Sequence, residues 1–319
     1  MKVIKKGLAI ALTAFCSAAF AQADYPNKPV RLIDPYSPGG STSVVSLALS
    51  KKFQDITGQS MVVEYKPGAA SNIGADLVAK SAPDGYTLLI AASSLAINPS
   101  LYPNMTYDPV KDLAPIAMLT RAPNVLAVHP SLPVNNVAEL IEYARANPGK
   151  LNYGSSGNGA TNHLAMELFK TMSNTDIQHV PFKGGGEAMA ALVGGHVQVM
   201  FNPAASLVPQ GQKGTMRLIA VGSTQPVKGL DLPTVDSTLP GFESSVWFGL
   251  FAPSGTPEEV ITKLNGYVNQ MLDDPQTKEN FNKAGFETIG GPSETLAKAL
   301  TGDVARWADI IKKANVKID

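Results

Sequence analysis

The sequence predicts an α/β protein of two lobes, each with a parallel-rich sheet flanked by helices, and a ligand cleft between the lobes. Short β-rich runs alternate with amphipathic helix patterns along much of the 319-residue chain, which is typical of parallel sheet. The chain is also longer than a single core usually organises. Proline- and glycine-rich connections at residues 121–124 and 222–241 predict two crossings between lobes. We therefore expect residues 24–122 and 240–319 in one lobe and residues 123–239, including the return crossover, in the other.

The N-terminal segment has the pattern of a cleaved secretory signal. Lys2, Lys5 and Lys6 precede an apolar run at residues 7–20, and two A-x-A sites follow at residues 19–23. The run is too short to span a bilayer. A buried first helix is the alternative, but no polar residue caps the run. Because Cys16 is the only cysteine and lies in this segment, residues 1–23, we expect a mature chain without a disulfide or a cysteine metal ligand.

The composition argues against nucleic acid as a partner. Residues 1–23 carry three of the 26 basic residues and none of the 26 acidic ones, so the other 296 residues have 23 basic and 26 acidic residues. The resulting net charge near −3 is unsuited to a polyanion. A content of 44% hydrophobic and 16% charged residues indicates a well-packed globular protein.

The elements of the first lobe follow from alternating periodicity. Strands are predicted at residues 30–33, 61–64 and 87–90. The helix after the first strand ends near residue 57, and the next begins near residue 73.

The second lobe repeats this alternation. Strands are predicted at residues 125–128, 151–153, 177–180 and 197–201, with helices between them. Asn136 and Glu139 approximate a capping pair at the start of the first of these helices.

The last quarter of the chain is predicted to be mostly helical. Thr256 is a candidate N-cap, followed by Pro257 at the first helical position and by Glu259 at the third. Apolar residues then recur on one face through residue 272, and a second amphipathic pattern covers residues 296–311.

The sequence lacks the motifs of several enzyme classes. Residues 154–158 place Asn158 where a nucleophile elbow has glycine. The only Gly-Lys pair is followed by Leu151, which excludes a Walker loop. In a dinucleotide fingerprint beginning at Gly157, Asn162 would replace the third glycine.

The histidines do not form a recognisable site. His129, His163, His179 and His196 lack the spacing of metal ligands, so surface or structural roles are expected. We predict neither a metal nor a cofactor.

Two glycine-rich turns are the strongest binding signals. Residues 38–43 and 154–161 each lie between a predicted strand and a predicted helix. Glycines allow backbone amides to approach a ligand, and the following helix N-terminus carries partial positive charge and unpaired N–H groups. Each turn alone could be an ordinary βα connection. Because one turn falls in each lobe, we favour an anion site in the cleft.

At these turns the sequence resembles a known family, the Bug-type solute receptors of tripartite tricarboxylate transporters. The resemblance covers essentially the whole mature chain. The matching segments are residues 25–33, 38–40, 63–69, 72–74, 82–88, 98–99, 151–155, 163–164, 180–184, 194–195 and 247–253. Their order and spacing, more than any one of them, make the resemblance specific.

The resemblance implies a type II-like, two-lobed periplasmic binding protein fold that closes on a small organic carboxylate. It implies a periplasmic location, delivery of the ligand to membrane transporter subunits and no catalysis. We expect a monomer. The same cleft could instead serve an enzyme acting on a small carboxylate or a chemosensory receptor, and the ligand itself is not specified.

The resemblance also places the ligand residues. The two turns contribute Ser37, Gly39, Gly40, Ser41, Thr42 and Ser43 from the first lobe and Ser155, Ser156, Gly157, Asn158 and Thr161 from the second. Further candidates are Lys183 and Gly184 in the second lobe, Ser93 and Ser94 at a strand end of the first, and Asn72 and Asn202. Ser43 stands where the family usually has aspartate, Leu47 where it often has arginine, and Ala160 where a hydroxyl is usual.

Overall fold

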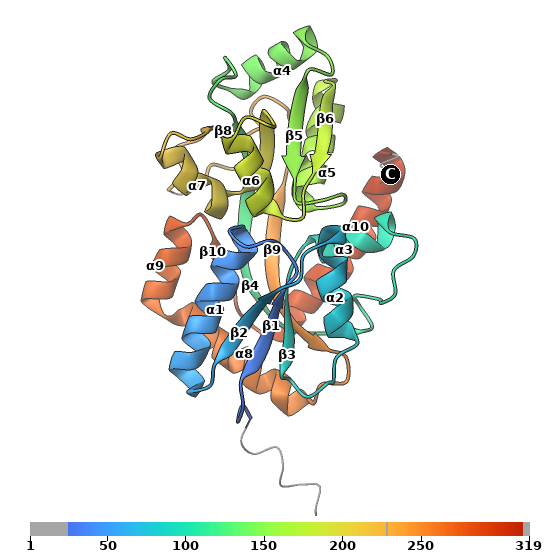
Figure 1. Ribbon diagram of the computed structural model, residues 1–319, viewed down its shortest axis with the longest axis vertical. Coiled ribbons are helices and arrows are strands. Elements are labelled where there is room, and N and C mark those ends of the chain that lie inside the picture. The colour runs from blue at the N-terminus through green and yellow to red at the C-terminus, as the bar shows by residue number, and fades with distance from the viewer. Residues whose placement is uncertain (1–24, 228, 315–319) are drawn as a thin grey trace, which may run out of the picture.

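The computed structural model describes residues 25–227 and 229–314 (Figure 1). The predicted signal segment therefore lies outside the described residues. In chain order the strands are β1 Val30–Asp34, β2 Met61–Tyr65, β3 Thr87–Ala92, β4 Leu113–Val128, β5 Leu151–Ser155, β6 Ile177–Pro181, β7 Val199–Pro203, β8 Arg217–Val221, β9 Ser245–Pro253 and β10 Glu287–Thr288. The α-helices are α1 Ser41–Thr57, α2 Asn72–Ala79, α3 Ser94–Leu101, α4 Val137–Ala146, α5 Thr161–Ser173, α6 Gly185–Val193, α7 Ala204–Gln212, α8 Glu258–Asp273, α9 Pro275–Lys283 and α10 Ser293–Ala314.

The strands form two halves that share the long strand β4. The order along the sheet is β2-β1-β3-β9-β4-β7-β5-β6, with β8 and β10 also paired to β4. Strand β1 is parallel to β2 and β3, and β5 is parallel to β6 and β7, whereas β4 is antiparallel to β7, β8 and β9. The parallel prediction is therefore confirmed for β1–β3 and for β5–β7, whereas the predicted strand at residues 125–128, which is part of β4, runs antiparallel to its neighbours.

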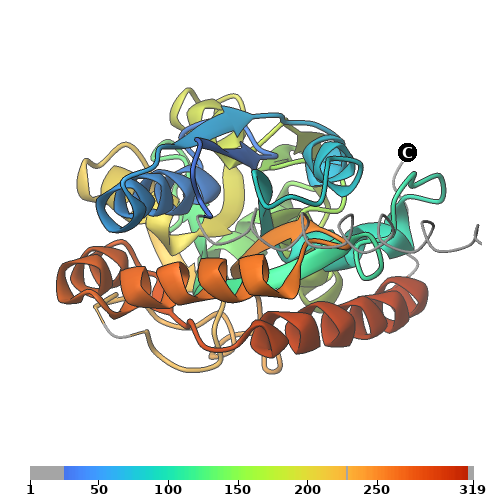
Figure 2. The ribbon, with the colours of Figure 1, turned by 90° about the horizontal axis from the view of Figure 1, so that it is seen from below.

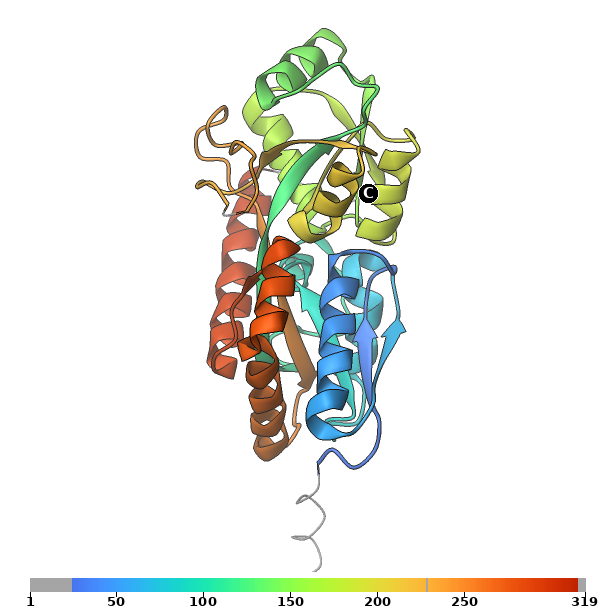
Figure 3. The same cartoon turned by 90° about the vertical axis from the view of Figure 1, so that its left-hand side faces the viewer.

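The two halves of the sheet, with their helices, form two lobes. The first lobe contains β1, β2, β3 and β9 with α1–α3 and α8–α10, and the second contains β5–β8 with α4–α7. Figure 3 shows the lobes one above the other, with β4 passing from one into the other. This confirms the two-lobed α/β fold class. The residue limits predicted for the lobes, at 122–123 and 239–240, stay a prediction.

The first crossing between the lobes lies within a continuous strand, so residues 121–124 do not form the separate connection that the sequence predicted. Pro123 pairs with Ser245 of β9, and Asn124 pairs with Pro203 of β7. Proline has no N–H to donate. Pro123 lies where β4 changes from pairing with β9 to pairing with β7. Its missing N–H therefore falls at the end of each set of strand-to-strand hydrogen bonds and not in the middle.

Two helix starts test the predicted caps. At α4 the side-chain oxygen of Asn136 accepts the Glu139 N–H at 2.9 Å, and Asn136 Nδ2 donates to Glu139 Oε1 at 2.6 Å, so this capping pair is confirmed. At α8 the Thr256 cap is wrong. Pro257 occupies the N-cap position, and the Thr256 hydroxyl donates to the Pro253 carbonyl at 2.7 Å.

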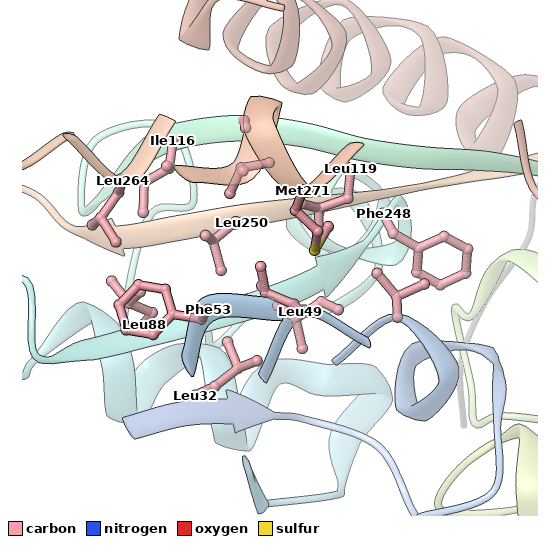
Figure 4. Close-up of a cluster of buried hydrophobic side chains, with 14 of the residues drawn as sticks. Leu32, Leu49, Phe53, Leu88, Ile116, Leu119, Phe248, Leu250, Leu264 and Met271 are labelled. Carbon is pink, nitrogen blue, oxygen red and sulfur yellow. The ribbon is translucent and has the colours of Figure 1, made fainter. Parts of the chain in front are cut away.

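The hydrophobic core of the first lobe lies between helix α1, the strands and helix α8. Figure 4 shows Leu32 and Leu88 from the strands, Phe53 from α1 and Leu264 from α8 meeting in this layer. Figure 2 shows α8 and α10 along the outside of β4 and β9. Each fully buried side chain of this size contributes about 1.5–3 kcal/mol. The packed layer fixes the end of β1 and the start of α1, from which the first glycine-rich turn extends.

The second lobe has its own core around Tyr153, Phe169, Phe201 and Phe242. It fixes the ends of β5 and β7 in the same way. Within residues 25–227 and 229–314, no helix is both long and apolar enough to cross a bilayer.

Candidate ligand-binding cleft

A narrow cavity of about 40 Å³ lies between the lobes. This is several times the roughly 10–15 Å³ that one water molecule needs. The first lobe lines it with Tyr36, Gly40, Ser41, Thr42, Ala92, Val246 and Phe248. The second lobe lines it with Ser156, Ala160, Thr161, Asn162, Gly185, Asn202 and Pro203.

Four helices begin at this cavity. Its lining includes Ser41 at the start of α1, Thr161 of α5, Gly185 of α6 and Pro203, which precedes α7. None of these four helices has a side-chain hydrogen bond capping its first turn, in contrast to α4 and α9. Helix N-termini present unpaired N–H groups and partial positive charge. The cavity is therefore suited to an anion.

The lining contains no lysine, arginine, histidine, aspartate or glutamate. Any anion must therefore be held by backbone N–H groups, hydroxyls and amides. One such hydroxyl, Ser41 Oγ, is buried and has no hydrogen-bond partner in the part of the chain that the structure describes. A buried polar atom without a partner is costly, so it is a natural place for a ligand oxygen.

The first turn is shaped by a buried carboxyl group, Asp34, at the end of β1. Asp34 Oδ1 accepts the Tyr36 N–H at 3.2 Å, and Oδ2 accepts the Ser46 hydroxyl at 3.0 Å. Burial raises the pKa of Asp34 to about 7, although these hydrogen bonds lower it. Gly39 has a φ of 87°, a conformation that favours glycine. Asp34 thus ties the turn to both β1 and α1.

The second turn is organised by Asn162. Its side-chain oxygen accepts the Ser156 N–H at 3.1 Å, and its Nδ2 donates to Ser156 Oγ at 3.0 Å and to Asn202 Oδ1 at 3.1 Å. Asn202 Nδ2 in turn donates to Ser206 Oγ at 2.8 Å. This network joins the starts of α5 and α7 on the second-lobe side of the cavity.

Two histidines support the second turn from behind. The rings of His163 and His179 stack 4.1 Å apart, and His179 also stacks on Tyr153 at 4.7 Å. Burial lowers the pKa of His163 to about 4 and that of His179 to about 3, so both are neutral near pH 7. His163 Nδ1 accepts the Gly159 N–H at 3.1 Å. These histidines hold the turn, and neither lines the cavity.

One side of the cavity is apolar. Ala92, Val246 and Phe248 of the first lobe lie among its lining residues. The cavity therefore combines helix N-termini with a hydrocarbon surface, an arrangement that fits a carboxylate attached to a short carbon skeleton.

Six of the predicted ligand residues line this cavity. They are Gly40, Ser41, Thr42, Ser156, Thr161 and Asn202.

The remaining predicted residues of the first lobe do not line this cavity. Ser37 donates to Glu187 in the second lobe at 2.8 Å, and Ser43 Oγ accepts the Gly39 N–H at 3.2 Å. Ser94 bonds with the Tyr36 hydroxyl, and Asn72 Oδ1 accepts from Asn98 Nδ2 at 2.9 Å and from the Tyr107 hydroxyl at 2.8 Å. Ser93 lines a separate cavity of about 140 Å³, which also includes Thr161, Trp247 and Arg121.

In the second lobe, Gly157, Asn158 and Lys183 line an outer cavity of about 390 Å³, near Ala70 and Tyr102 of the first lobe. Ser155 Oγ lies 2.6 Å from His179 Nε2 and accepts the Gly157 N–H at 3.2 Å. Gly184 packs against Ser37.

The other lining residues were not named as ligand residues from the sequence, although Ala160 and Asn162 lie in or next to the second glycine-rich turn. The residues not named are Tyr36, Ala92, Ala160, Asn162, Gly185, Pro203, Val246 and Phe248. Gly185 and Asn162 carried a usable signal, because they belong to the glycine run after β6 and to the glycine-rich turn after β5. Val246 and Phe248 read as ordinary buried strand residues.

The described residues contain no group of three or more His, Cys, Asp or Glu side chains positioned to hold a metal ion.

The fold and the interlobe cavity define a two-lobed solute-binding protein of the periplasmic type. Residues 45–316 match the receptors of the tripartite tricarboxylate transporter family, and the chain belongs to this family. The resemblance to Bug-type receptors is thereby confirmed. BugT of Bordetella pertussis (strain Tohama I) is 33% identical over 312 residues, which cover 96% of this chain and 95% of BugT.

Two solved structures have the same fold. Rpa4515 of R. palustris, determined with adipate, has a TM-score of 0.90 and 35% identity, covering 92% of this chain and 99% of that chain. MatC of Rhodopseudomonas palustris, with bound malate, has a TM-score of 0.86 and 29% identity, covering 90% of this chain and 100% of that chain.

Proposed function

We propose that this protein is a periplasmic receptor that binds a small organic carboxylate between its lobes and delivers it to a tripartite tricarboxylate-type membrane transporter. The observation that carries the proposal is the meeting of four helix N-termini, without side-chain caps, at one cavity that has no charged lining residue. The adipate and malate bound by two structural relatives support the ligand class.

The cavity also suggests how the ligand is oriented. A carboxylate fits at the starts of α1 and α5, where the Ser41 hydroxyl and the Thr161 turn meet it. The carbon skeleton then lies against Val246 and Phe248. A lysine in the lining would hold an anion mainly as a point charge, whereas fixed N–H groups and hydroxyls also select it by geometry.

A thermal-shift screen tests the ligand class. The panel contains malate, adipate, longer aliphatic and aromatic carboxylates, and the matched uncharged amides. A ligand at 100 times its dissociation constant stabilises the protein by roughly 2.7 kcal/mol. We expect at least one carboxylate, and none of the amides, to raise the melting temperature. Stabilisation by amides alone would contradict the proposal.

A charge placed at the cavity tests the mode of binding. In Ser41→Asp the new carboxylate stands at the start of α1, where it would occupy the place of the ligand's own. We expect this variant to fold and to lose carboxylate affinity by about 100-fold, or roughly 2.7 kcal/mol. The neutral control Ser41→Asn should retain affinity within about tenfold. Equal binding by all three proteins would place the ligand elsewhere.

We further propose that the receptor acts as a monomer without turnover. Ligand incubated with the protein should be recovered chemically unchanged, which nuclear magnetic resonance of the mixture can establish. Appearance of a product would indicate a cleft enzyme. Deleting the protein should abolish uptake of its ligand, whereas loss of a chemotactic response with normal uptake would indicate a sensor.

Export through a cleaved signal completes the proposal. We expect a mature N-terminus at Gln22 or Asp24, on the basis of the two A-x-A sites. Mass spectrometry of the periplasmic protein measures it. An intact Met1 or a lipid on Cys16 would refute this part.

A further inference from the structure

The two lobes touch directly through the first glycine-rich turn. Residues 37–40 of the first lobe meet residues 184–187 at the start of α6 in the second lobe. We call this contact the clasp. It lies beside the ligand cavity, because Gly40 and Gly185 line that cavity.

The backbones approach so closely at the clasp that there is no room for a side chain at Gly184 or Gly186. A Cβ atom added to Gly186 would lie 2.4 Å from the Pro38 carbonyl oxygen, and one added to Gly184 would lie 2.7 Å from the Ser37 nitrogen. Both distances are far below ordinary contact, and both neighbouring atoms belong to the backbone of the other lobe. A flexible side chain cannot move aside to relieve either clash.

A single side-chain hydrogen bond joins the lobes at the same place. Ser37 Oγ donates to Glu187 Oε1 at 2.8 Å, although the two residues are 150 positions apart. The second carboxylate oxygen, Oε2, accepts the Lys183 N–H at 3.3 Å. Glu187 lies in the first turn of α6, where the helix dipole favours its charge. The carboxylate is thus positioned to hold the serine of the opposite lobe.

We propose that the clasp holds the two lobes closed. Gly184 and Gly186 leave room for the backbone of the first turn, and Glu187 holds that turn through its hydrogen bond with Ser37. These residues position the first ligand turn over the second lobe. Because every group in the clasp belongs to the protein, the closed arrangement forms in the ligand-free protein as well. The inference rests on the proposed function only in regarding closure as a step in ligand capture.

Gly186→Ala isolates the steric part of the clasp. The substitution lies in α6, where alanine favours helix over glycine, so the second lobe should fold normally. Gly266→Ala is the matched control. It lies within helix α8, and nothing lies within 4 Å of the added Cβ.

Double electron–electron resonance measures the distribution of distances between two spin labels, one in each lobe, and needs no ligand. The labels are attached to Leu47→Cys on α1 and Val193→Cys on α6, which are 55% and 39% exposed and lie in different lobes, with Cys16 replaced by serine. Without ligand, we expect a short-distance population in the labelled parent protein and in the control variant Gly266→Ala. Gly186→Ala should lose this population, and Glu187→Ala should reduce it several-fold.

If the parent and Gly186→Ala gave the same distance distribution, the proposal would be overturned. Circular dichroism shows whether each variant is folded. If Gly186→Ala does not fold, Glu187→Ala provides the test, and an unchanged distance distribution in that variant would contradict the proposal. Because no ligand is present, failure here is separate from failure of carboxylate binding, which the screen above measures.

Discussion

The buried Asp34 gives a prediction that can be worked through in numbers. Its carboxyl group is fully buried beside the first turn, and burial raises its pKa to about 7. In the unfolded chain an aspartate has a pKa of about 3.9. Between these values the folded protein keeps a proton that the unfolded chain has lost. The free energy of unfolding therefore falls as pH rises from about 4 to 7, and this effect levels off above pH 7.

The size of the effect follows from the linkage relation. Each pH unit within this window lowers the free energy of unfolding by at most about 1.4 kcal/mol. Between pH 5 and pH 8 the expected loss is about 2–3 kcal/mol. Asp34→Asn removes the titration, and its amide oxygen can still accept the Tyr36 N–H. The difference in unfolding free energy between wild type and Asp34→Asn should therefore shift by about 2–3 kcal/mol in favour of the variant over this range.

Urea unfolding at pH 5, 6, 7 and 8 measures this difference. Subtracting the variant from wild type is necessary because His163 and His179, whose pKa values are lowered, give the opposite slope below about pH 6.5. Asp274→Asn is a suitable control, since hydrogen bonding to Thr277 lowers the Asp274 pKa to about 2, and this group does not titrate between pH 5 and 8. Parallel pH profiles for wild type and Asp34→Asn would refute the reasoning.

Three further predictions concern side chains near the cleft and far from it. Ser43→Asp should fold and change carboxylate affinity by less than about tenfold in calorimetric titration. The reason is that Ser43 Oγ accepts the Gly39 N–H and that Ser43 does not line the cavity. A larger loss of affinity would mean that this side chain faces the ligand. Asn202→Ala should lower the free energy of unfolding by about 1–3 kcal/mol, measured by urea titration, because Asn162 Nδ2 loses one of its acceptors, and should weaken binding. Asn136→Ala should cost about 1 kcal/mol of stability with unchanged affinity, since it only uncaps α4; altered affinity would contradict a local role.

Local patterns predicted much of the fold. Alternating periodicity placed β1, β5 and the helices after them, and the Asn136 cap could be read from two residues three positions apart. Only residues 125–128 of strand β4 were predicted, because Pro123 is locally a turn signal and only its position between two partner strands makes it acceptable within a longer strand. Thr256 likewise resembled a cap, yet its hydroxyl bonds a nearby carbonyl instead.

The candidate site was predictable where it depends on a turn next to its own helix. Ser41 and Thr161 follow glycine-rich turns, and both line the cavity. The apolar wall was not predictable, because Phe248 reaches the cavity through the pairing of β9 with β3 and β4, which is set far along the chain. The hydrogen bond between Ser37 and Glu187 could not be predicted either, since nothing in the sequence near one residue indicates the other.

The clearest test of anion recognition in the cleft is isothermal titration of the purified mature protein with the best carboxylate from the thermal-shift screen and with its matched amide. We predict saturable binding of one carboxylate per protein, at least about 100-fold tighter than the amide, or roughly 2.7 kcal/mol. This preference should disappear in Ser41→Asp. Equal affinity for carboxylate and amide, or an undiminished preference in Ser41→Asp, would contradict a cleft that recognises anions through its helix N-termini.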